Sequence, residues 1–207
     1  NTVKSCCTLF RASAVIGFPA CIGAAVLAEP LLSMLYSGRA AEVSVCSGAF
    51  AVLCTGGLFM IVASAMFGVF QAIGKAHIPL VLMCFSVALK AILNPVLMSV
   101  PQLNICGAAL ATSACYFMVA LTGSLILRRE LRGKISVFSC VSRPLISSLF
   151  CGTAAGIVYN VLKYSAGTPL NVIIAVLSGA FVYGISLIPT ANFRRNRQLI
   201  KSNRKNS

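Results

Sequence analysis

The chain has 207 residues, of which 58% are hydrophobic and only 10% are charged, and its mean hydropathy is +0.93. Soluble domains average about 25% charged residues, so this composition excludes a water-soluble globule, a disordered chain and a collagen-like chain. Lys and Arg number 17 against 3 Asp and Glu, a formal charge of +14, but most basic residues flank long apolar segments, which favours a role in membrane topology over nucleic-acid binding.

Six apolar segments follow one another along the chain, at about 13–36, 43–70, 78–100, 106–127, 145–162 and 170–188. About 20 helical residues span a bilayer core, and lipid offers no partner for backbone N–H and C=O groups. The pattern therefore predicts an all-α polytopic membrane bundle of six transmembrane helices. Residues 1–207 form a single membrane region in this interpretation, with short loops between antiparallel neighbours and a basic tail at 189–207.

The first apolar segment is too long for a cleaved signal peptide, and five more segments follow it. The chain opens on Asn1 rather than Met, so a start within a longer protein is one expectation.

Lys and Arg residues show which side of the membrane each loop faces. Fourteen of them lie in the N-terminal segment, the second and fourth loops and the C-terminal tail, whereas the opposite loops hold two, Arg39 and Lys163. This distribution predicts that both termini are cytoplasmic. The tail, with six cations and no acid, either binds anionic lipids of the inner leaflet or only fixes the topology.

The cysteines and the other reactive residues indicate no chemistry. Ten Cys occur without a CxxC motif, and His77 is the only His, so neither a metal site nor a disulfide scaffold is predicted. Most of the Cys lie in apolar segments, where they act as small hydrophobic residues. The chain has no Asp and three Glu, and no catalytic set is visible. We expect no enzyme activity and no cofactor.

Lys90 is the outstanding residue of the third segment, about 18 Å along its helix from the cytoplasmic end. A central Lys costs about 2.5–3.5 kcal/mol on insertion, roughly half of what the twelve Leu, Ile, Phe and Val residues of this segment return. Ser86, Lys90 and Asn94 recur every four residues and form one polar stripe. We interpret the stripe as the wall of a water-filled cavity that binds an anionic substrate; the alternative is a structural Lys paired inside the bundle.

Glu29 is the only acid within a predicted span. It could pair with Lys90 or carry a coupling ion. The alternative is an interfacial Glu near the outer end, where Pro30 breaks the helix. We favour this alternative, because depth alone is weak evidence for an ion site.

Several short segments then suggest a family. They read RASAVIGFP at 11–19, LAEPLLSMLY at 27–36, FQAIGK at 70–75, NPVL at 94–97 and ICGAA at 105–109. Together they resemble the stage V sporulation protein B-like branch of the polysaccharide flippases, in the multidrug/oligosaccharidyl-lipid/polysaccharide exporter superfamily.

The resemblance implies transport of a lipid-linked sugar across the bacterial plasma membrane by alternating access, in polysaccharide or peptidoglycan synthesis or in sporulation. It also implies fourteen helices, of which this chain holds about nine to fourteen, so the missing N-terminal helices are expected to be needed. Lys90, Asn94 and Ser86 are then the candidate contacts of the pyrophosphate. The alternatives are an ion-coupled multidrug exporter of the same superfamily and a non-transporting membrane scaffold.

Overall fold

The computed structural model describes residues 2–36, 38, 40–100, 104–131, 137–162 and 170–186. All regular structure in these ranges is helical, as α1 (Thr2–Val26), α2 (Ala28–Leu35), α3 (Ala40–Ala72), α4 (His77–Met98), α5 (Asn104–Glu130), α6 (Val137–Leu162) and the further helix Leu170–Ser186. The prediction of an all-α polytopic membrane bundle is confirmed.

Five helical stretches of the described chain are long and apolar enough to cross a membrane: Ser5–Val26, Glu42–Ala72, His77–Met98, Ile105–Glu130 and Cys140–Leu162. The sixth predicted span, 170–188, corresponds to the shorter apolar helix Leu170–Ser186. Its last two positions lie outside the described residues, as does the basic tail at 189–207.

The first predicted span, 13–36, differs most from the structure. Its helix begins at Thr2 and ends at Val26, and α2 continues the path from Ala28 to Leu35. Pro30 explains the break, because it has no N–H to donate to the carbonyl of Val26. The chain stays helix-like across the break, since the Leu27 N–H donates to the Gly23 carbonyl at 3.0 Å and the Leu31 N–H to the Leu27 carbonyl at 2.9 Å.

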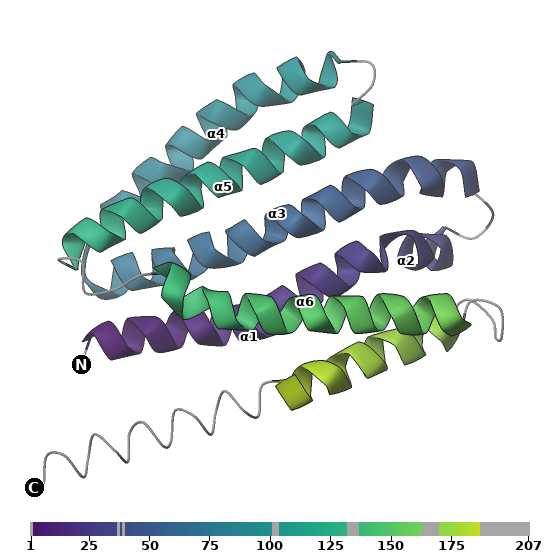
Figure 1. The fold of residues 1–207 in the computed structure, drawn as a ribbon. Helices are drawn as coiled ribbons and strands as arrows, with labels where there is room; N and C mark the ends of the chain where they lie inside the picture. The colour runs from purple at the N-terminus through teal and green to yellow at the C-terminus, as the bar shows by residue number, and fades with distance from the viewer. Residues whose placement is uncertain are drawn as a thin grey trace, which may run out of the picture.

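The helices pack in a row, with spatial neighbours that differ from sequence neighbours. In the order α4, α5, α3, α1, α6, each packs against the next, and Leu170–Ser186 lies beyond, against α6 and α1 (Figure 1). The largest side chains of the main core come from α1, α3 and α5 and are Phe10, Phe18, Met66, Phe70 and Leu127. Helix α4 is at the edge of the row and packs almost entirely against α5.

Two side-chain links join neighbouring helices near their ends, one between the α3–α4 turn and α5 and the other between α1 and α6. Lys75, between α3 and α4, forms an ion pair with Glu130 at the end of α5. Cys7 of α1 forms a disulfide with Cys140 of α6, with a Cα–Cα distance of 5.8 Å. The other eight cysteines are free. This disulfide could not be predicted from the sequence, because 133 residues separate its partners and such a pairing is set by the fold alone.

Helices α4 and α5 approach most closely at the opposite end of their hairpin, where Gly107 faces Leu97. A Cβ atom on Gly107 would lie 2.5 Å from the carbonyl oxygen of Leu97. Backbone cannot swing aside as a side chain can, so this contact requires glycine. The small residue thereby sets the separation of the two helices that carry most of the polar residues discussed below.

Replacement of Gly107 by Ala is expected to lower the free energy of unfolding by about 1–3 kcal/mol, the range for overpacked sites. Thermal unfolding in detergent measures the change. The matched control is Gly23→Ala on α1, where the added Cβ would meet nothing within 4 Å and Ala favours the helix. Equal melting temperatures for Gly107→Ala and the unsubstituted chain would contradict the close approach.

Candidate functional site

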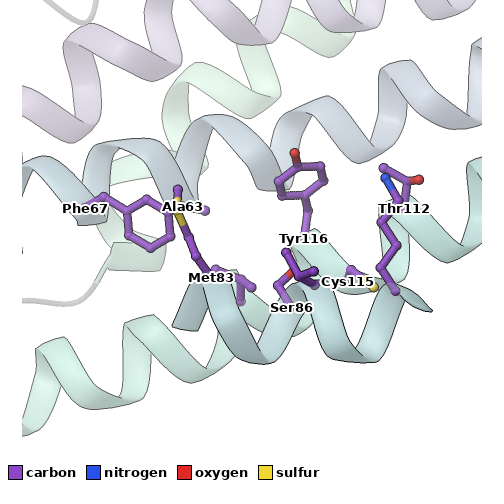
Figure 2. A pocket seen from close by; sticks show the side chains of 10 residues that line it. Ala63, Phe67, Met83, Ser86, Thr112, Cys115 and Tyr116 are labelled. Atoms are coloured by element: carbon purple, nitrogen blue, oxygen red, sulfur yellow. The ribbon is translucent and has the colours of Figure 1, made fainter. Parts of the chain in front are cut away.

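A hollow of about 260 Å³ lies between α3, α4 and α5 (Figure 2). Its walls are mostly apolar, with a few polar groups from α4 and α5. The lining residues are Ala63 and Phe67 of α3, Met83, Ser86, Val87 and Lys90 of α4, and Thr112, Cys115, Tyr116 and Val119 of α5. This combination of an apolar wall with a small number of polar groups is typical of ligand-binding pockets.

Two of the three residues in the predicted polar stripe line this hollow. Ser86 and Lys90 are one helical turn apart on α4, so both point to the same side. Lys90 is exposed, and no described residue forms an ion pair or hydrogen bond with it. The ammonium therefore depends on water or on a bound anion within the membrane-spanning part of the chain.

The third residue of the stripe, Asn94, is not among the lining residues. Its Oδ1 atom is buried and accepts no hydrogen bond from the described residues. Four residues of α-helix turn about 400°, so each step along the stripe rotates by about 40°. The side chain of Asn94 is thus rotated by about 80° around the axis of α4 from that of Ser86. This rotation takes it away from the hollow and toward the contact of α4 with α5.

Glu29 lies elsewhere. It is exposed in the first turn of α2, and α2 packs on α3 whereas Lys90 is carried by α4 on the far side of α5. Across the described ranges, Lys90 and Glu29 form no ion pair. The pairing considered from the sequence is therefore absent from this arrangement.

The residues of α5 that line the hollow, here called the α5 wall, were not predicted from the sequence. Two of them, Thr112 and Tyr116, face the hollow one turn apart. The Thr112 hydroxyl donates to the Ala108 carbonyl at 2.9 Å, whereas the Tyr116 hydroxyl has no hydrogen bond with any described residue. The four-residue spacing of Thr112 and Tyr116 is visible in the sequence and indicates a shared helix face. It does not show that this face meets the hollow, because the equally polar Ser113 points to α3, where its hydroxyl donates to the Val52 carbonyl at 3.0 Å.

A second, larger pocket of about 420 Å³ lies toward the other end of the row, between α1, α2, α6 and Leu170–Ser186. Small residues widen it, namely Ala20, Gly23, Ala24, Ala155, Gly179 and Ala180. The Tyr183 hydroxyl at its edge donates to the Val15 carbonyl at 2.8 Å, which leaves the pocket almost wholly apolar. No cluster of three or more His, Cys, Asp or Glu able to hold a metal occurs among the residues that the structure describes.

A family model described as lipid II flippase MurJ matches residues 5–191, which include every helix of the row. No curated protein matches the chain.

Substitution of Lys90 by Cys tests whether the hollow contains water. We expect a membrane-impermeant maleimide to label Lys90→Cys in proteoliposomes, with the exposed native Cys84 replaced by Ser in every sample. Ile92→Cys is the matched control, because Ile92 is 64% exposed but lies two residues on, on the opposite face of α4, outside the hollow. Added mass per chain is the readout. Equal labelling of both variants, or of neither, would contradict a water-filled hollow.

Proposed function

The chain belongs to the MurJ family of lipid II flippases, and from this premise we propose that the hollow between α3, α4 and α5 binds the pyrophosphate of the lipid-linked sugar. The family moves a lipid-linked cell-wall precursor across the bacterial plasma membrane, and its members are transporters. The five long apolar helices agree with a multi-pass protein of that membrane.

The observation that carries the proposal is the unpaired ammonium of Lys90 beside an empty volume. None of the residues that line the hollow is acidic, so the cation is not neutralised there by the described chain. In apolar surroundings, with an effective dielectric constant far below that of water, an anion gains strongly from such a cation. The Ser86 hydroxyl, one turn away on α4, supplies a further donor to a phosphate oxygen.

The second pocket supports a cargo with a lipid part. It is about 420 Å³ in volume, apolar and open between helices, and an apolar chain that enters it gains by leaving water. A molecule with an anionic head and an apolar tail would therefore find both kinds of site on this chain. The site for the head lies between α3, α4 and α5, and the site for the tail lies between α1, α2, α6 and Leu170–Ser186.

An ion-coupled multidrug exporter of the same superfamily is the alternative from the sequence. A cationic cargo or coupling ion favours carboxylates in its binding site, and the hollow has none among its lining residues. Glu29, the candidate coupling residue, lies on α2 outside the hollow. A non-transporting scaffold does not explain why a central Lys is retained at its insertion cost.

The finer assignments are also proposals. The stage V sporulation protein B-like branch and a role in sporulation rest on the short resemblances at 11–19, 27–36, 70–75, 94–97 and 105–109. We further propose cytoplasmic termini, with this chain in the place of helices nine to fourteen and the tail at 189–207 on anionic lipid. The ion pair between Lys75 and Glu130 agrees with the proposed topology, because it joins two helix ends that are predicted to face the cytoplasm. The Cys7–Cys140 disulfide does not support it, because disulfides are rare in the reducing cytoplasm.

Lys90→Ala tests the proposal in a reconstituted flippase that includes any N-terminal helices preceding this chain. We expect the rate of lipid II translocation to fall about tenfold or more, the loss of one charge-assisted hydrogen bond, while Lys90→Arg keeps a substantial part of the rate. Translocation in vesicles is measured by the accessibility of a labelled headgroup.

Ile92→Ala is the control for a change on α4 outside the hollow. A Lys90→Ala variant that inserts normally and translocates lipid II at the original rate would exclude Lys90 as a cargo contact.

A further inference from the structure

We propose that Tyr116 binds the first sugar of the cargo and makes the hollow prefer a sugar-bearing lipid pyrophosphate over a sugar-free one. This inference rests on the proposed function, because it assumes that Lys90 holds the pyrophosphate. It adds a second wall to the site. The α4 wall recognises the anion, and the α5 wall recognises the group attached to it.

The first support is the unsatisfied hydroxyl of Tyr116. Buried Tyr hydroxyls usually find a hydrogen-bond partner, and a polar group without one is costly in apolar surroundings. Tyr116 is half-buried in a helix of membrane-spanning length, yet its hydroxyl bonds to no described residue. The partner must therefore enter the hollow, as water or as cargo.

The second support is the division of polar groups between the walls. The cation Lys90 and the hydroxyl of Ser86 both belong to α4. On α5, the hydroxyl proton of Thr112 is already used within its own helix, so Tyr116 is the free donor of that wall. Figure 2 shows its ring rising from α5 beside α3, on the other side of the hollow from Ser86 and Met83.

The chemistry of a tyrosine side chain fits a sugar ring. Its flat apolar face can cover the C–H groups of a pyranose while its hydroxyl bonds to a sugar hydroxyl. A phosphate gains nothing from the aromatic face, which is electron-rich. Val119, three residues on along α5, extends the apolar surface next to Tyr116, so this side of the hollow suits a sugar better than a second phosphate.

The volume limits how much cargo the hollow can take. About 260 Å³ equals the liquid volume of roughly nine water molecules at about 30 Å³ each. The hollow is not enclosed, so it surrounds the pyrophosphate and the sugar next to it while later parts of the cargo extend beyond it. Selectivity in the hollow is therefore expected to concern the presence of the first sugar rather than the identity of later ones.

Binding of two lipids to Tyr116→Phe tests this inference. The lipids are a prenyl pyrophosphate and the same prenyl pyrophosphate carrying one sugar, and native mass spectrometry of the detergent-solubilised full chain measures their dissociation constants. We expect Tyr116→Phe to weaken the sugar-bearing lipid about three- to tenfold, the loss of one hydrogen bond between neutral groups, and to leave the sugar-free lipid unchanged.

The matched control is Tyr159→Phe on α6, which loses the same hydroxyl outside the hollow. Equal weakening of both lipids by Tyr116→Phe, or no weakening of either, would overturn the inference while leaving the pyrophosphate site intact. If the unsubstituted chain binds the sugar-free lipid no more tightly than the Lys90→Ala variant does, the proposed function is wrong. This inference is then wrong with it.

Discussion

The structure depends on one constraint, which is that a positive charge in the apolar part of a membrane protein needs water or an opposite charge beside it. Lys90 has neither an acid nor a hydrogen-bond acceptor from the described chain. The hollow between α3, α4 and α5 places an open volume beside the Lys90 ammonium where a paired side chain would otherwise lie. A buried ion pair would stabilise the same cation permanently, but it would leave nothing for a cargo to neutralise. Lys90 can bind an anionic cargo because no acidic residue of the described chain already pairs with it.

The order of the helices explains how such a space persists. Helix α3 lies between α5 and α1 and contributes Met66 and Phe70 to the main core. Helix α4 is held at the edge of the row by α5 alone for most of its length. An edge helix need not close every gap with a second neighbour, so open space remains beside the polar groups Ser86 and Lys90 on its inner face. The dense packing that stabilises the chain and the open volume that binds a ligand are therefore in different parts of the row.

The sequence predicts one wall of the site because the four-residue spacing of Ser86 and Lys90 defines a face of a single helix. It does not predict the other wall. Whether Thr112 and Tyr116 or Ser113 faces α4 is decided by the rotation of α5, which depends on contacts between helices such as Gly107 with Leu97. Hydropathy also places the first span at 13–36, whereas α1 begins at Thr2, because helical hydrogen bonding continues past the apolar residues that mark the bilayer.

The disulfide between Cys7 and Cys140 turns the chain from α1 to α6 into a closed ring of covalent bonds. Within that ring, α1 and α6 cannot slide apart at the end where the bond lies. The apolar pocket near Leu27 and Ala155 lies toward the other end of this helix pair, where side-chain packing such as that of Ile22 and Val26 on Gly152 joins α1 to α6 in place of a covalent bond.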